Sequence, residues 1–250
     1  WETVNAGAQS TIQSASNLCK FTEKQKCHRR GRFPTLAIGV SFGGGQKVPG
    51  NLKLSKCNRL ADWQCNASYV IKTFDGYLDS RTVTHNPPMY KAYCDNQETL
   101  HASDHLLQKN FNNSVFEATT VNFGNTCTDE HTDDRNRADR WCVITAIGNF
   151  DQKMGGHLIL WDLRLIIEFP AGSSIFIPSA LITHSNISVA PDEVRFSMTQ
   201  YTAGGLFRWV YNSFCSDITV MKQADKSERA QREHDRRLRW KLGLQNFPRF

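Results

Sequence analysis

Between residues 114 and 201 the chain consists of short apolar runs that are separated by glycine, proline and polar residues. The runs span residues 115–123, 141–148, 157–161, 165–169, 174–177 and 194–201. They are rich in β-branched and aromatic residues, and they follow one another at intervals of about ten residues. Such a series is typical of a β-sandwich or a β-barrel, so we predict a mainly β fold.

The length of 250 residues is enough for one sizeable core, and mainly β proteins of this size are commonly single domains. We divide the chain into three parts. Residues 1–113 are predicted to form an N-terminal arm with helical and strand decorations packed on the barrel, and residues 114–221 the β core. Residues 222–250 are predicted to form a basic C-terminal helix, because residues 225–242 contain no glycine or proline.

The part before residue 114 carries fewer patterns. Its first 27 residues show little periodicity, and we expect a polar arm or a short helix there. Apolar and aromatic residues are scattered over residues 52–107, where helices packed on a sheet are expected. Pro87 and Pro88 exclude a helix that continues through this position.

The net charge of +6 is unevenly distributed. Residues 20–60 contain ten lysines and arginines against one acidic residue, and residues 222–250 contain nine against four. Two basic ends around an acidic middle indicate a polyanionic partner, although on charge alone ordinary solvated surfaces explain them equally well. Three charged residues interrupt the longest apolar run, 158–169, so we expect no membrane span.

The chain contains eight cysteines, an even number that permits disulfides. Cys142, however, lies within an apolar run, and no signal-like segment indicates secretion. The pairs Cys19/Cys27 and Cys57/Cys65 each have seven residues between them, which is not the spacing of a zinc module. We therefore predict reduced, intracellular thiols.

The motif His131-Thr132-Asp133 is the strongest candidate for a functional site. Side chains two apart in an extended segment point the same way, so His131 and Asp133 can reach one point. His184 supplies a second imidazole, and two histidines with one carboxylate describe the facial triad of non-haem Fe(II) oxygenases. The competing interpretation is a charged surface loop over residues 128–136.

Arg195 and Ser197 lie two residues apart in a predicted strand and therefore share one face. A guanidinium together with a hydroxyl is a suitable fork for a carboxylate. His157 and Asp162 form a rival ligand pair, but five residues apart on one strand they point to opposite faces. We expect His157 at most to line the pocket, and Asp162 to lie at a strand end.

Taken together, these segments resemble the TET/JBP family of 2-oxoglutarate- and Fe(II)-dependent nucleic-acid-base dioxygenases, with the greatest likeness to its fungal, transposon-associated branch. The segments that carry the resemblance are 121–133, 141–151, 155–163, 169–180, 184–186 and 195–210. It implies a double-stranded β-helix, which is a jelly-roll barrel with helices packed outside. It also implies a nuclear enzyme that oxidises the methyl group of a DNA base.

The resemblance also implies roles for individual residues. The implied iron ligands are His131, Asp133 and His184. Arg195 and Ser197 are implied to hold the distal carboxylate of 2-oxoglutarate, and Asn136 to lie near the substrate base. The cofactors would be Fe(II) and 2-oxoglutarate with O₂ as cosubstrate, and the co-products succinate and CO₂.

Three functions remain open at this point. The first is oxidation of 5-methylcytosine or N6-methyladenine in duplex DNA, which requires the target nucleotide to be flipped out, because a base inside a duplex cannot reach a buried iron. The second keeps the fold and the iron but acts on a protein or a small molecule. The third is a catalytically decayed DNA-binding relative. We expect a monomer in each case.

Overall fold

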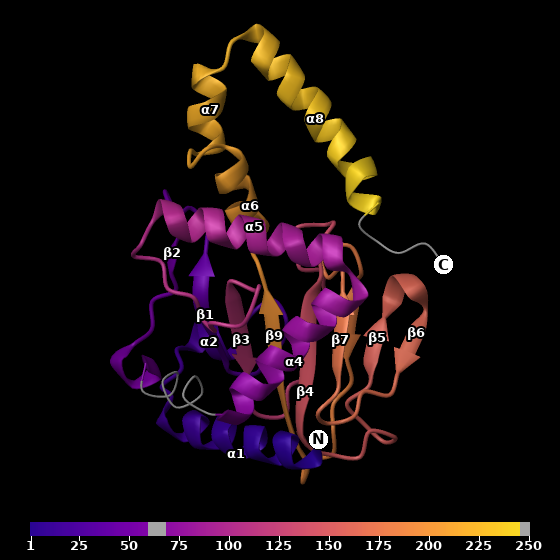
Figure 1. The fold of residues 1–250 in the computed structure, drawn as a ribbon. Coiled ribbons are helices and arrows are strands. Elements are labelled where there is room, and N and C mark those ends of the chain that lie inside the picture. The colour runs from indigo at the N-terminus through magenta and orange to yellow at the C-terminus, as the bar shows by residue number, and fades with distance from the viewer. Residues whose placement is uncertain (60–68, 246–250) are drawn as a thin grey trace.

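The computed structural model describes residues 1–59 and 69–245, and their strands form two antiparallel sheets (Figure 1). The large sheet has the order β2-β1-β3-β9-β4-β7. Its strands are β1 (Thr35–Ser41), β2 (Gly50–Asn51), β3 (Ala118–Asn122), β4 (Cys142–Asn149), β7 (Ser174–Ile177) and β9 (Val194–Tyr201). The small sheet, of order β6-β5-β8, comprises β5 (Leu158–Leu160), β6 (Leu165–Ile167) and β8 (His184–Asn186). The predicted mainly β jelly-roll fold with flanking helices is confirmed.

Successive side chains of the central strand β9 point to opposite faces of the large sheet, and the two faces have different surroundings. Phe196 and Met198 belong to a buried apolar cluster that also contains Ala8 and Ile12 of the first helix. The alternate residues of the same strand, Arg195, Ser197, Thr199 and Tyr201, line a cavity on the opposite face. The large sheet therefore has one face against helices and one face toward the site.

The helices α1 (Glu2–Leu18), α4 (Tyr69–His85) and α5 (Pro87–Ser103) cover the large sheet, while α2 (Glu23–Lys26) is a single turn (Figure 1). As predicted, the helix does not continue through the proline pair, since α4 ends before it and α5 begins on it. The Asn86 side chain accepts a hydrogen bond from the Met89 backbone and caps α5.

Helix α1 corrects the prediction of a polar arm or a short helix, because it runs for 17 residues. Its buried stripe consists of Ala8, Ile12 and Ala15, which recur at the helical spacing of three and four. Two of these three are alanines, so the stripe carries little hydrophobic signal in the sequence. The helix is fastened to the sheet by the Asn5 carboxamide, which donates to the Gly148 carbonyl at 2.8 Å.

The chain leaves the large sheet through α6 (Gly204–Tyr211), and α7 (Asp217–Gln223) and α8 (Lys226–Leu244) then project beyond it (Figure 1). Helix α8 is the basic helix that was predicted for this part of the sequence. Strand β1 is hydrogen-bonded within the large sheet although it precedes residue 114. The division at residue 114 stays a prediction.

Gly39 in β1 allows an unusually close approach to the neighbouring chain. Its φ is +101°, and a Cβ atom there would lie 2.2 Å from the Glu117 carbonyl oxygen. We expect Gly39→Ala to lower the free energy of unfolding by about 2–4 kcal/mol, because it adds both a clash and an unfavourable backbone conformation. Chemical denaturation measures this change.

Gly50 in β2 is the matched control, because a Cβ atom there meets nothing within 4 Å. We expect Gly50→Ala to change the stability by less than about 0.5 kcal/mol. Equal effects of the two substitutions would contradict the close approach at Gly39.

Two further expectations concern the whole chain. Within the described residues, no helix has the length and apolar character that a membrane crossing requires. The seven cysteines that the structure describes are free thiols. Cys65 lies outside the described residues, so the structure does not describe the Cys57/Cys65 pair.

Candidate metal centre

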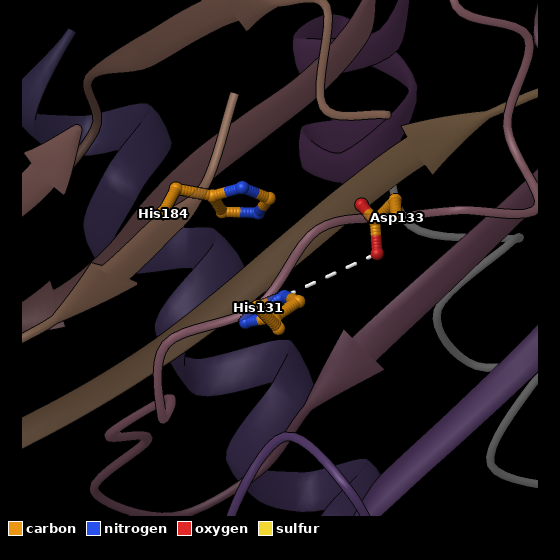
Figure 2. Close-up of side chains that lie close together, drawn as sticks. All are labelled: His131, Asp133 and His184. Carbon is orange, nitrogen blue, oxygen red and sulfur yellow. Dashed lines mark ion pairs between the residues drawn. The ribbon is translucent and has the colours of Figure 1, made fainter. Parts of the chain in front are cut away.

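The three residues of the predicted triad come together at the edge of the small sheet. His131 and Asp133 lie on the loop before β4, and His184 is the first residue of β8. The backbones of His131 and His184 pair with each other through two hydrogen bonds, of 3.1 and 2.9 Å. One nitrogen or oxygen atom of each of the three side chains lies within 4.8 Å of the others, and Figure 2 shows the side chains around one space.

Hydrogen bonds fix which ring nitrogen each histidine presents. The Nδ1 atom of His131 lies 2.7 Å from the Asp129 carbonyl oxygen, and the Nδ1 atom of His184 lies 2.8 Å from the Ile182 carbonyl oxygen. A carbonyl oxygen only accepts hydrogen bonds, so Nδ1 is a protonated nitrogen in both rings. In the neutral form of each ring the lone pair is therefore on Nε2, which is the arrangement that a metal-binding histidine requires.

The position of the Asp133 carboxylate is set by the backbone on one side and by Arg30 on the other. The Asp133 backbone donates to the Ser179 carbonyl at 2.8 Å, and the Arg30 guanidinium donates to the carboxylate. Burial by itself raises the pKa of Asp133. The positive charge of Arg30 and the nearby imidazoles outweigh burial, so the pKa lies below its usual value.

Burial also acts on His131, whose pKa falls from its usual value to about 4. The cause is desolvation of the imidazolium, to which the neighbouring His184 adds. His131 is therefore neutral and Asp133 ionised at neutral pH. A neutral imidazole and a carboxylate are the forms that bind a metal ion.

Asn186, two residues after His184, holds the approach to the first ligand in place. Its side-chain oxygen accepts hydrogen bonds from the Thr128 backbone at 2.9 Å and the Thr128 hydroxyl at 2.8 Å. Its amide donates to the Thr126 carbonyl at 2.9 Å. These bonds tie the segment that leads to His131 to strand β8, which carries His184.

Arg195 is almost fully buried, with 2% of its surface exposed. Its guanidinium donates to the Thr126 carbonyl at 3.0 Å, and its Nε atom has no hydrogen-bond partner. Burial lowers its pKa to about 10. Among residues 1–59 and 69–245 no carboxylate lies within 4.0 Å of the Arg195 guanidinium. Its buried positive charge is therefore not compensated by an ion pair, and a bound anion would stabilise it.

Ser197 points into the same cavity and accepts a hydrogen bond from the Asn122 amide at 2.8 Å. Its own hydroxyl proton is therefore available to a ligand. Arg195 and Ser197 share a face of β9, as predicted, and together present a guanidinium and a hydroxyl to the cavity.

A single cavity of about 530 Å³ contains all six predicted site residues. They are His131, Asp133, Asn136, His184, Arg195 and Ser197. The Asn136 amide donates to the Ser179 hydroxyl at 3.1 Å, next to the loop of the first two ligands. The predicted residues are thus brought together in space, which the alternative of a charged surface loop does not explain.

Other residues of this cavity were not found from the sequence. They are Arg29, Arg30, Phe42, Asn122, Thr128, Arg135, Asn186 and Tyr201. The contact of Arg30 with Asp133 could not be predicted from neighbouring residues, because the two are 103 positions apart and Arg30 lies in an ordinary basic stretch. Asn122 and Tyr201 had a signal that was not used, since both lie in predicted strands.

The rival pair lies elsewhere. His157 is not among the residues that line this cavity in the described structure. Asp162 lies in a short 3-10 helix (Trp161–Leu163) that follows β5, and its carboxylate accepts a hydrogen bond from the Thr183 backbone at 2.6 Å. The two residues form no common site.

No family model and no curated protein matches the sequence of this chain. In structure it is similar to NgTET1 in complex with 5mC DNA, with a TM-score of 0.55 and 14% identity over 79% of this chain and 68% of that chain. That likeness shows a shared fold.

Two further solved structures are more distantly similar. One is an oxidoreductase of the 2OG-Fe(II) oxygenase family from Burkholderia pseudomallei, with a TM-score of 0.39 and 12% identity over 79% of this chain and 78% of that one. The other is a collagen prolyl hydroxylase from Paramecium Bursaria Chlorella virus-1 in its 2OG complex, with a TM-score of 0.29 and 19% identity over 46% and 72%.

The chain shares the fold of NgTET1, in agreement with the TET/JBP resemblance of its sequence. Within that fold the described residues contain one His-Asp-His group that could hold a metal ion.

Proposed function

We propose that this protein is an Fe(II)- and 2-oxoglutarate-dependent dioxygenase that oxidises the methyl group of a methylated base in DNA. The observation that carries the proposal is the convergence of a three-ligand group and an unpaired buried guanidinium on one cavity. The shared fold with NgTET1 in complex with 5mC DNA supports the same class of reaction. A nuclear location follows from this function and is part of the proposal.

The donor set suits the metal. His131 and His184 would bind through Nε2, and Asp133 through its carboxylate. Bound Fe(II) and 2-oxoglutarate would supply the electrons that activate O₂ for the oxidation of a methyl group. Arg30 would keep the Asp133 carboxylate oriented.

Two further residues of the same cavity suit the cosubstrate. The Arg195 guanidinium would neutralise the distal carboxylate of 2-oxoglutarate, and Ser197 would donate a second hydrogen bond to it. Both groups are already desolvated, so an incoming carboxylate recovers electrostatic energy at little further cost.

The substrate base would enter from the side of Asn136. This side chain lies three residues after Asp133 and offers an amide oxygen and nitrogen to the edge of a base. Duplex DNA would have to release the target nucleotide from its stack for its methyl group to reach the site. The cavity is within the range of about 300–1,000 Å³ that ligand sites occupy.

The test is incubation with Fe(II), 2-oxoglutarate and duplexes that carry either 5-methylcytosine or N6-methyladenine, followed by nucleoside mass spectrometry. We expect oxidised nucleosides from one of the two marks, and succinate above the level that an unmethylated duplex produces. Succinate without any change in the DNA would overturn the DNA substrate and favour a protein or small-molecule hydroxylase. Absence of both products would indicate a decayed relative.

A further inference from the structure

Two hollows lie beside the metal cavity, between the loop 134–139, α6, α7 and α8. The first, of about 700 Å³, reaches from that loop to α6 and the end of α8, and the second, of about 440 Å³, lies between α7 and α8. Arg208, Tyr211 and Arg239 line both hollows. We call the combined feature the arginine groove, lined by Arg135, Arg137, Arg208, Arg229, Arg232, Arg236 and Arg239.

The arginine groove is continuous with the metal cavity. Phe42, Gly43, Gly44, Arg135 and Asn136 line both the first hollow and the cavity. A polymeric ligand that is bound along the groove can therefore place one of its residues in the metal cavity.

The charge of the groove is not neutralised. Each of its acidic residues has an arginine partner, which lies outside the groove for Asp134 (Arg29) and within it for Asp217 (Arg208). Asp139 and Glu233 likewise pair with the groove arginines Arg137 and Arg236. Four of its arginines have no carboxylate within 4.0 Å among the residues that the structure describes. These four are Arg135, Arg229, Arg232 and Arg239.

Helix α8 lines the groove with four arginines that remain accessible to solvent. Arg229, Arg232, Arg236 and Arg239 recur at spacings of three and four, so they share one face of the helix. The end of α8 comes so near to the loop that a Cβ atom on Gly243 would lie 2.6 Å from the Cβ atom of Asp139. These arginines are therefore held over the groove.

Tyr211 orients two of these groups. The guanidinium carbons of Arg232 and Arg239 lie 5.7 and 5.1 Å from the centre of its ring. Such cation–π contacts fix the planes of the guanidinium groups. Arg232 also donates one hydrogen bond to the Asn212 side-chain oxygen at 3.1 Å, and its other N–H donors face no carboxylate within 4.0 Å among the described residues. At 1.5 Å per residue the 19 residues of α8 extend for about 28 Å, which is roughly eight base-pair steps of DNA at 3.4 Å.

We infer that the arginine groove binds the sugar-phosphate backbone of the DNA whose target base enters the metal cavity. The inference rests on the proposed function for the identity of the polyanion, and the unpaired arginines along one continuous path carry the rest. Planar guanidinium groups match phosphate oxygens in pairs, and several along one line suit a regularly spaced polyanion. An acidic protein segment is the competing occupant.

The experiment compares two double variants of the full chain that lose the same charge from the same helix. Arg232→Ala with Arg239→Ala removes two groove arginines, and Arg237→Ala with Lys241→Ala removes two positive charges that do not line the groove. Fluorescence anisotropy with a short labelled unmethylated duplex and metal-free protein gives the dissociation constant between ~50 and 200 mM salt. Melting temperatures check that each variant folds.

We expect the groove variant to bind at least about tenfold more weakly and its salt slope to fall by about two, since each lost phosphate contact lowers the slope by roughly one. The Arg237/Lys241 variant is expected to keep the slope of the unchanged protein. A variant with Arg232→Lys and Arg239→Lys keeps both charges and should recover most of the binding, which separates charge from folding.

Equal weakening by the two alanine pairs would overturn the groove and indicate a diffuse charge effect. So would failure of the unchanged protein to bind the duplex at ~50 mM salt, or displacement of DNA by poly-glutamate at equal charge concentration. Because no turnover is needed, the outcome is independent of catalysis. Groove-dependent binding without base oxidation would leave the groove standing and reject the proposed function.

Discussion

Asp133→Ala is expected to abolish succinate formation and to weaken Fe(II) binding at least about 100-fold. Even the outer partners of metal ligands are worth roughly 10–100-fold in affinity, and Asp133 is a candidate ligand itself. Two imidazoles would remain, without the negative charge that holds a divalent cation. Succinate release and Fe(II) titration, each with saturating 2-oxoglutarate, measure the two effects.

The fold is expected to survive this change. Asp133 lies on a loop, and its partner Arg30 has 38% of its side chain exposed, so water can solvate the guanidinium once the carboxylate is gone. The matched control is Asp134→Ala, one residue further on. Its carboxylate is 68% exposed and pairs with Arg29 on the surface, where an ion pair contributes little. Turnover that survives in Asp133→Ala would rule out the proposed triad.

Arg195→Lys is expected to raise the concentration of 2-oxoglutarate needed for half-maximal turnover by roughly 10- to 100-fold. An ammonium group keeps the charge but cannot offer the paired N–H donors of a guanidinium, and one charge-assisted hydrogen bond is worth about 1.5–3 kcal/mol. The rate at saturating 2-oxoglutarate should fall much less, because the metal ligands are unchanged. Succinate production at a series of 2-oxoglutarate concentrations separates the two quantities.

Arg140→Lys controls for the general cost of replacing a buried arginine. Arg140 is 8% exposed, but it pairs with Asp139 and does not line the metal cavity. We expect its 2-oxoglutarate requirement to match that of the unchanged protein. If the two lysine variants behave alike, Arg195 does not hold the cosubstrate.

The sequence predicted the strands of the core well because their signal is local. Alternation along β9 and the turns between the runs are visible within a few residues. The same locality placed Arg195 and Ser197 on one face. The meeting of His184 with His131 required the resemblance or the structure, since 53 residues separate them and loop geometry decides the outcome.

The parts that escaped prediction depend on long-range contacts or on weak local signals. Helix α1 buries a stripe made largely of alanine, so its amphipathic pattern is faint. Arg30 meets Asp133 only because the turn over residues 28–31 lies against the loop of the ligands. The path from the metal cavity to α8 depends on how that helix leaves the sheet, and no residue pattern specifies this direction.

The pairing of Arg30 with Asp133, together with the place of β1 in the large sheet, bears on how this protein can be shortened. A fragment that starts at residue 114 would retain every candidate iron ligand, and also Arg195 and Ser197, the proposed partners of the 2-oxoglutarate carboxylate. It would lack the Arg30 guanidinium beside Asp133, Phe42 in the lining of the cavity, and strand β1, which is hydrogen-bonded to β3. The smallest piece expected to retain a complete site therefore begins upstream of Arg29.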